Sequence, residues 1–196
     1  MNVLSLNWEL GCCSGPDASC ESYVPARVPG NVQLDWARAK GLPDYTYGEN
    51  YKQYAFMEYL YWRYRAHAFV DADAECAVLF FDGIDYEYVI SVNGEKVCEG
   101  AGLFTPVRID ISRYIGQAVD VEVLILPVPK HGDIPDRTQA DHSVKPPVSY
   151  GWDWHPRLIP SGLFEPAGIE LLPAAHVERF DLSYTLSEDR GAAMLR

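Results

Sequence analysis

Apolar and polar residues alternate with a period of two through much of the chain. In the segment 60–70 the even positions are apolar or aromatic, whereas the odd positions include Arg63, Arg65 and His67. One apolar face and one polar face are typical of a β-strand that covers a core. The three basic side chains should then share the outer face, where they either line a ligand groove or, as is more common, simply contact solvent.

The same pattern predicts a series of short strands with turn residues between them. Asn93-Gly94 separates two of these runs, and this dipeptide between alternating runs is a strong β-hairpin signal. Short strands at this spacing predict an all-β fold, namely an antiparallel β-sandwich of the jelly-roll type. The expected strands cover residues 3–10, 60–70, 77–81, 86–92, 95–98, 107–111, 119–125 and 169–172.

Two short segments have helical rather than strand character. Asn31 is a favourable N-cap for a helix over residues 32–40, and Gly41 supplies its C-terminal stop. A second short helical piece is expected over residues 50–57. The segment 11–29 contains glycine and proline turn signals, so we expect it to be a loop.

A long stretch, residues 127–168, shows no comparable strand pattern. Connections of this length are usually functional or disordered, and the aromatic residues in this one argue for order. We therefore expect the sandwich to carry one long ordered loop. Residues 1–174 are assigned to the sandwich domain. Residues 175–196 are assigned to a linker whose alternation at Phe180, Leu182, Tyr184 and Leu186 suggests the first strand of a following domain.

The composition is that of a globular protein with an acidic surface. Of the 196 residues, 48% are hydrophobic and 22% are charged, and the formal net charge is −12. Because such a surface repels phosphate groups, we expect no nucleic-acid partner and no binding to anionic membranes. No apolar run is long enough to predict a membrane span, and the first residues lack the basic start of a signal peptide, so a cytoplasmic protein is expected.

The cysteines give no sign of a metal site or of a disulfide framework. Their number is odd and no Cys-x-x-Cys occurs, so we expect reduced, mostly buried thiols. A metal shared by the first three is disfavoured because no fourth ligand follows at a familiar spacing. The cysteines are Cys12, Cys13, Cys20, Cys76 and Cys98.

The strongest candidate chemistry lies within the long loop. Trp152, Asp153 and Trp154 are consecutive, and Arg157 follows them closely. Indoles offer flat apolar faces, Asp accepts hydrogen bonds through two oxygens, and Arg donates through a rigid fork. A sugar needs both kinds of contact, so these four residues are candidate substrate-binding residues. The alternative is a loop whose tryptophans fold back as a small satellite core.

A catalytic site within this chain is a weaker hypothesis. It would use Asp153 with Glu165, or a metal ion held by the acidic and histidine residues of the loop. Such residues are more often polar side chains of a loop that simply contact solvent, and their spacing matches no known metal signature. No Gly-x-Ser-x-Gly elbow is present. We expect no catalytic residue, no metal and no cofactor; the metal hypothesis would need His131, Asp133, Asp136 and His142.

Several motifs, in order from about Leu6 to Leu172, resemble the N-terminal sugar-binding, galactose-binding-domain-like domain of glycoside hydrolase family 2. Gly151-Trp152-Asp153-Trp154, with Pro156-Arg157 and Ser161-Gly162, is similar to the β-mannosidase branch of that family. The other matching pieces are Leu6 and Trp8, Val28-Pro29-Gly30, 40–44, Asn50, Trp62-Arg63-Tyr64 with Phe69, 81–85 and Val92-Asn93-Gly94.

The resemblance implies a larger parent protein in which immunoglobulin-like sandwiches and a TIM barrel follow this domain. The two catalytic glutamates of that family lie in the barrel, and nothing in the present chain corresponds to them. The resemblance further implies that the long loop reaches the barrel, with Trp152, Asp153 and Trp154 in the sugar pocket and Arg157 as support. The implied partners are a β-mannoside or related carbohydrate and the downstream domains.

The sequence departs from the family pattern at two places. His155 stands where glycine is usual, and Phe164-Glu165 replaces what is commonly Trp-Arg. Both changes put the sugar specificity in doubt. Two functions therefore stay open: an accessory domain of a retaining exo-glycosidase, which is inactive alone, and a free-standing carbohydrate-binding module.

Overall fold

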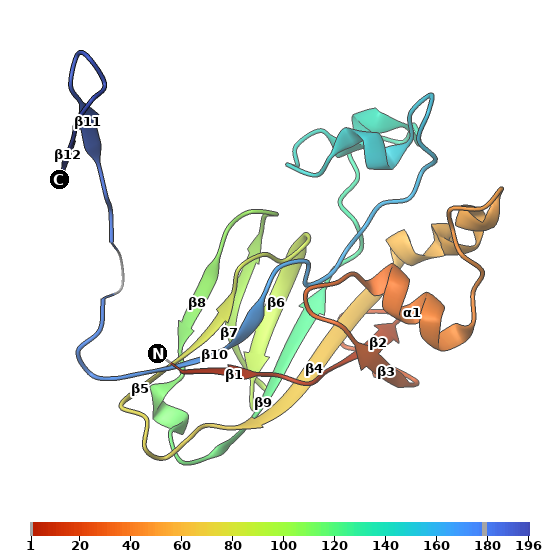
Figure 1. Ribbon diagram of the computed structural model, residues 1–196. Helices are drawn as coiled ribbons and strands as arrows, with labels where there is room; N and C mark the ends of the chain where they lie inside the picture. Colours follow the sequence, from red (N-terminus) through yellow and green to blue (C-terminus); the bar gives the residue numbers. More distant parts are fainter. Residues whose placement is uncertain (1, 178–179) are drawn as a thin grey trace.

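The computed structural model describes residues 2–177 and 180–196, and its main body consists of two β-sheets packed face to face (Figure 1). One sheet has the strand order β1-β10-β5-β8, and the other has the order β3-β2-β4-β9-β6-β7. All pairings within both sheets are antiparallel. The predicted antiparallel β-sandwich is therefore confirmed.

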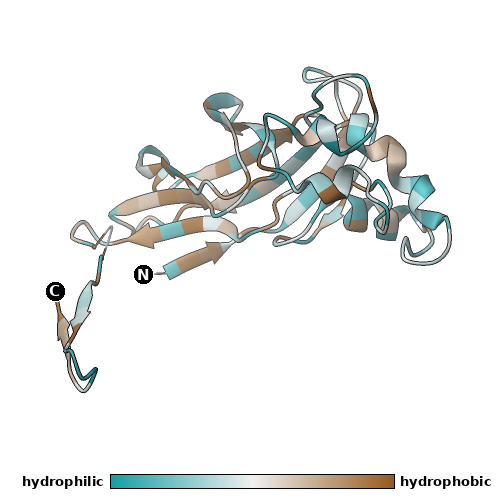
Figure 2. Ribbon diagram, turned by 90° about the horizontal axis from the view of Figure 1, so that it is seen from above, coloured by the Kyte–Doolittle hydropathy of each residue, from teal (hydrophilic) through white to brown (hydrophobic). Residues whose placement is uncertain are grey.

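The strand bounds follow the predicted runs closely. The four-stranded sheet contains β1 (Asn2–Ser5), β5 (Cys76–Phe81), β8 (Val107–Asp110) and β10 (Ala167–Leu172). The six-stranded sheet contains β2 (Trp8–Cys13), β3 (Tyr23–Ala26), β4 (Tyr61–Phe69), β6 (Glu87–Val92), β7 (Glu95–Ala101) and β9 (Ala118–Ile125). Figure 2 shows apolar and polar residues alternating along these strands.

The core fills the space between the two sheets. In β4 the even residues Trp62, Tyr64 and Ala66 are buried, whereas Arg65 and His67 are exposed. This is the period predicted for the segment, and it places one face of the sheet against the core. Other strands contribute further buried side chains to the same cluster, among them Leu10, Leu79, Phe81, Tyr88, Ile90, Val119, Val121, Val123 and Ile169.

The basic row on the outer face of β4 is neutralised by carboxylates on neighbouring strands. Exposed pairs of this kind contribute little to stability, about 0–1 kcal/mol each. A broad hollow of about 1040 Å³ lies over part of this face. Since each side chain of the row has a carboxylate partner, the solvated sheet face is the better description. The pairs are Arg63–Glu122 (3.5 Å), Arg65–Glu9 (2.7 Å) and His67–Asp120 (2.7 Å).

The single strand expected over residues 3–10 is wrong, because this segment forms two strands in different sheets. β1 pairs with β10, and β2 pairs with β3 and β4. Leu4 and Leu6 pack against the core and Trp8 and Leu10 are buried in it. The alternation thus continues across the break, since the chain keeps the same side toward the core while it crosses from one sheet to the other.

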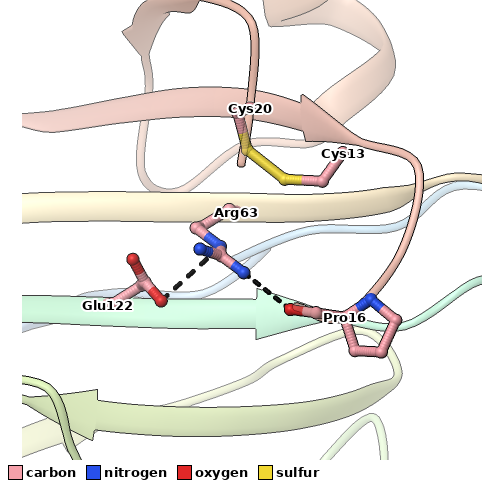
Figure 3. The surroundings of a disulfide bond; sticks show 5 residues. All are labelled: Cys13, Pro16, Cys20, Arg63 and Glu122. Atoms are coloured by element: carbon pink, nitrogen blue, oxygen red, sulfur yellow. Dashed lines mark hydrogen bonds and ion pairs between the residues drawn. A yellow bond between two sulfur atoms is a disulfide. The ribbon is translucent and has the colours of Figure 1, made fainter. Parts of the chain in front are cut away.

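The loop expected over residues 11–29 is also corrected, and the expectation of free thiols is wrong for Cys13 and Cys20, whereas Cys12, Cys76 and Cys98 are free and partly buried. β2 extends to Cys13, and the edge strand β3 lies within the segment. A disulfide joins Cys13 to Cys20, whose Cα atoms are 4.7 Å apart, a separation that suits a disulfide (Figure 3). The loop that it closes lies over β4, where the Arg63 Nη2 donates to the Pro16 carbonyl at 2.7 Å.

Both predicted helical segments are present. The helix α1 (Val32–Lys40) begins at Asn31, whose side chain accepts from the Leu34 amide at 2.9 Å, and ends at Gly41 with φ of 68°. The second segment, η1 (Asn50–Tyr59), is a 3-10 helix rather than an α-helix. It buries Tyr54 and Met57, whose spacing of three a 3-10 helix places on one face, and it also buries the adjacent Glu58.

The C-terminal residues form a separate two-stranded sheet of β11 (Tyr184–Leu186) and β12 (Ala193–Leu195). The strand predicted from Phe180 is therefore shorter than expected, and every residue of the pair is exposed. Within the described residues, no helix combines the length and the apolar character needed to cross a membrane.

Replacing Asn31 with Ala is expected to lower the free energy of unfolding by about 1 kcal/mol, because the Leu34 amide loses its acceptor. Urea denaturation followed by circular dichroism measures the change. Asn31→Asp keeps an acceptor oxygen and is the control, with an expected change below about 0.5 kcal/mol. Equal losses in the two variants would show that the cap is not the stabilising contact.

Candidate functional site

The loop between β9 and β10 is ordered and stands over one end of the sandwich (Figure 1). It contains two short 3-10 helices, η3 (Arg137–Ala140) and η4 (Pro147–Tyr150). It also has its own apolar cluster of Val128, Ala140, Tyr150 and Ile159. The satellite core considered from the sequence therefore exists, but these residues form it and the tryptophans do not.

The candidate residues Trp152, Asp153 and Trp154 form an exposed reverse turn. The amide of Trp152 donates to the carbonyl of His155 at 2.9 Å, and the amide of His155 donates back at 3.3 Å. Trp154 is 74% exposed and Trp152 is 40% exposed, and Asp153 is also exposed. Gly151 enters the turn with φ of 113°, a value that favours glycine. The turn thus presents two indoles and a carboxylate to solvent.

A hollow of about 510 Å³ adjoins this turn. The Arg137 guanidinium lies 4.1 Å from the centre of the Trp152 ring, which is a cation–π contact. Asp136 caps η3 by accepting from the Thr138 amide at 2.8 Å, and the Thr138 hydroxyl and amide lower the pKa of that carboxyl. The lining residues are Pro135, Asp136, Arg137, Thr138, Tyr150, Gly151, Trp152, Asp153, His155, Pro156 and Arg157.

Arg157 is held from behind the turn by a buried carboxylate. Its Nη2 donates to Glu58 Oε1 at 2.7 Å, and its Nε donates to the two carboxylate oxygens at 3.1 and 3.0 Å. Its Nη1 donates to the Tyr150 carbonyl at 3.2 Å. We expected Arg157 to hold the loop through a charge-assisted bond, and these contacts supply it with Glu58 as the partner.

A second buried ion pair joins the loop to the connection between β5 and β6. The Lys145 ammonium contacts the Asp85 carboxylate and donates to the Pro160 carbonyl at 2.7 Å. The main chain of Asp85 exchanges hydrogen bonds with Gly162 at 2.8 and 2.9 Å. Burial raises the pKa of Asp85 and lowers the pKa of Lys145, because each charged form loses its hydration.

The exposed turn is suited to bind a polar ring that has one apolar face. An indole can stack on the C–H face of a sugar, and the Asp153 carboxylate can accept hydrogen bonds from its hydroxyls. The two ion pairs, Arg157–Glu58 and Lys145–Asp85, hold the loop that carries the turn in place.

The catalytic alternatives find no support among the described residues. The rings of His131 and His142 lie 4.3 Å apart, yet no group of three or more His, Cys, Asp or Glu residues could hold a metal in that part of the chain. Glu165 does not line the hollow next to Asp153. Phe164, which precedes Glu165, packs edge-on against Phe104, with 6.0 Å between the ring centres.

The sequence analysis missed Glu58, Asp85 and Lys145. Each is a charged residue that is almost fully buried, with exposed fractions of 4%, 4% and 2%. Their partners are distant along the chain, with Arg157 lying 99 residues after Glu58 and Lys145 lying 60 residues after Asp85. No local pattern predicts such a pair, and a period of three would place Glu58 with the exposed Ala55 rather than with the buried Tyr54 and Met57 of η1.

An antiparallel sandwich of two sheets is consistent with a galactose-binding-like domain. The chain belongs to the family described as glycosyl hydrolase 2 galactose-binding domain-like, which matches residues 8–165.

The relatives of known activity are large glycosidases. β-Mannosidase B of Thermothelomyces thermophilus is 25% identical over an alignment of 189 positions that covers 86% of this chain and 21% of that protein. The structure of β-D-mannosidase from Dictyoglomus thermophilum superposes with a TM-score of 0.74 at 25% identity, over 95% of this chain and 24% of that one. The exo-chitosanase of Amycolatopsis orientalis, at 18% identity and a TM-score of 0.71, shares the fold over 100% of this chain and 24% of its own. The chain thus spans about a fifth of the length of its curated relatives.

Replacing Lys145 with Met should reduce the free energy of unfolding by about 3–5 kcal/mol, because Asp85 would be left buried without its cation. The double variant Lys145→Met, Asp85→Asn should recover part of this loss. Urea denaturation at pH 7 measures both. Similar losses in the single and double variants would contradict a stranded charge as the cause.

The pH dependence gives a second measure of the same pair. Burial raises the pKa of Asp85 in the folded state, and removing Lys145 takes away the charge that opposes this rise. The folded state then keeps a proton that the unfolded state releases above about pH 4, so stability falls as the pH rises. Between pH 5 and pH 7 we expect declining stability for Lys145→Met and a flatter profile for the double variant.

Proposed function

We propose that this chain is a non-catalytic carbohydrate-binding domain of a β-mannosidase-like, retaining exo-glycosidase. Its exposed turn forms one wall of a sugar pocket that another domain of the same protein completes. Asp153 accepts hydrogen bonds from the hydroxyls of the sugar, and an indole of Trp152 or Trp154 stacks on its ring. The catalytic carboxyls belong to the other domain, so this chain alone has no turnover.

The observation that carries the proposal is the exposure of the turn on an ordered loop. Two indoles exposed by 40% and 74% beside an unburied carboxylate are costly to keep in water unless a ligand covers them. The printed activities of the relatives fit this assignment, because two of the compared proteins are β-mannosidases that match this chain over a small share of their length.

The loop end of the sandwich also fits a protein partner. Large apolar side chains there are exposed in several segments that are separate in the sequence, and such patches are typical of interfaces. The proposed partner is the catalytic domain, and residues 175–196 would lead to it through an immunoglobulin-like domain. The exposed residues of η1, of the loop after β7 and of the long loop include Phe56, Tyr59, Phe104, Ile134 and Trp154.

The purified chain is expected to release no 4-nitrophenol from 4-nitrophenyl β-D-mannoside. When the chain is produced together with the catalytic part that the proposal requires, Asp153→Asn should lower kcat/KM by about 100-fold or more, as the loss of a charge-assisted bond to the sugar would. Asp133→Asn, which changes another exposed loop carboxylate, is the control. Turnover by the isolated chain would overturn the proposal.

The exposed indoles also favour a second candidate, a free-standing carbohydrate-binding module. Titration of the isolated chain with soluble mannans, followed by isothermal calorimetry, separates the two. An accessory domain should bind with a Kd above about 1 mM, because half of its pocket is missing. Binding in the micromolar range that is abolished by Trp154→Ala would instead favour the module.

A further inference from the structure

Glu58 lies at the end of η1 and contacts both ends of the long loop. Its carboxylate is 4% exposed and faces two cations that come from opposite ends of that loop. Near the start of the loop, the Lys130 Nζ lies 3.5 Å from Glu58 Oε1 and donates to the Glu58 carbonyl at 3.3 Å. That carbonyl also accepts from the Val128 amide at 3.1 Å. Near the end of the loop, Arg157 binds the carboxylate through both its Nε and its Nη2.

These contacts continue into a closed circuit through the base of the turn. Arg157 donates to the Tyr150 carbonyl at 3.2 Å, directly before Gly151 and the exposed tryptophans. The Tyr150 hydroxyl donates to the Pro129 carbonyl at 2.7 Å, which returns the circuit to the segment held by Glu58. The carboxylate and the main-chain carbonyl of Glu58 together hold the start of the loop, and the carboxylate also holds its end and the base of the turn through Arg157.

The Arg157–Glu58 contact restricts the orientation of the two side chains and does more than attract opposite charges. A guanidinium bound through two nitrogens to a carboxylate is restricted in orientation as well as in distance. With Arg157 fixed, the carbonyl of Tyr150 and the residues that follow it are fixed as well. A loop without sheet hydrogen bonds would otherwise exchange among conformations at little cost.

We propose that Glu58 is a positioning residue, which orients the Trp152–Trp154 turn for its ligand through Arg157 without touching the ligand. This inference rests on the proposed sugar-binding function for the identity of the ligand. Its structural part, the control of loop order by Glu58, stands on the contacts alone. A bound sugar thus depends on a carboxylate that lies outside the hollow, since Glu58 is not among its lining residues.

The test is Glu58→Gln, which keeps the size of the side chain and removes its charge. Amide hydrogen exchange of the whole chain is followed by mass spectrometry. We expect exchange in residues 128–157 to accelerate by about 10-fold or more, while β4, β9 and β10 keep their protection. Arg157→Lys keeps the charge but loses the fork and should give the same local effect. Glu9→Gln removes the carboxylate of the surface pair with Arg65 and is the matched control, with no change expected in the loop.

A functional readout separates positioning from general stabilisation. In the protein that contains the catalytic part, Glu58→Gln should lower kcat/KM for 4-nitrophenyl β-D-mannoside by about 10-fold or more at a temperature at which the sandwich remains folded. Glu58→Asp, which keeps a carboxylate, should restore part of the activity.

Three results would overturn the inference. Unchanged exchange in residues 128–157 would show that the loop is ordered without Glu58. Faster exchange throughout both sheets would show that Glu58 stabilises the whole domain. If Glu58→Gln does not fold, the exchange of Arg157→Lys decides the question instead. Local loosening without any effect on kcat/KM would show that the order of the turn is irrelevant to the reaction. If the wild-type protein has no glycosidase activity at all, the proposed function fails, whereas the exchange result still decides the role of Glu58 in the loop.

Discussion

Two buried ion pairs hold the long loop to the sandwich, and the shape of the candidate site depends on them. Main-chain hydrogen bonds at Val128 and Gly162 hold the two ends of the loop, and side chains tie down the part between them. Lys145 reaches Asp85 on one side, and Arg157 reaches Glu58 on the other. A buried charge without its partner is strongly destabilising, which makes each pair an all-or-none constraint. An intact pair adds little net stability compared with two apolar side chains in its place, but it allows few alternative positions for the loop.

The sandwich and the long loop have different physical roles in the domain. The sandwich buries its apolar faces and provides a rigid support, as the core between the sheets demands. The loop has only a small apolar cluster of its own and presents its indoles outward. Binding residues on a loop that a rigid scaffold positions are a common arrangement, because the support can stay constant while the loop varies. The departures at His155 and Phe164 fall in this variable part.

Local sequence signals predicted the elements whose causes are local. The helix α1 was predictable from Asn31 and Gly41, which cap it directly, and β4 was predictable from its period of two. The change of sheet between Ser5 and Trp8 was not, because the alternation continues through it. For the site, the turn at residues 152–154 was predictable from residue types alone. The buried ion pairs that hold the turn were not predictable, because the partners of Glu58 and Asp85 lie 99 and 60 residues away along the chain. The Cys13–Cys20 disulfide has a short span, but only the path of the chain after β2 brings the two sulfurs together.

The passage of the N-terminal segment from one sheet to the other has a mechanical consequence. β1 lies at the edge of its sheet and is bonded on one side only, to β10, whereas β2 is bonded on both sides. A force applied at the first residues would therefore peel β1 away stepwise and then meet Trp8, whose indole is wedged against Tyr64 and Phe81. Attachment of the protein to a surface through this end would load one short edge strand and spare the end of the sandwich that carries the long loop.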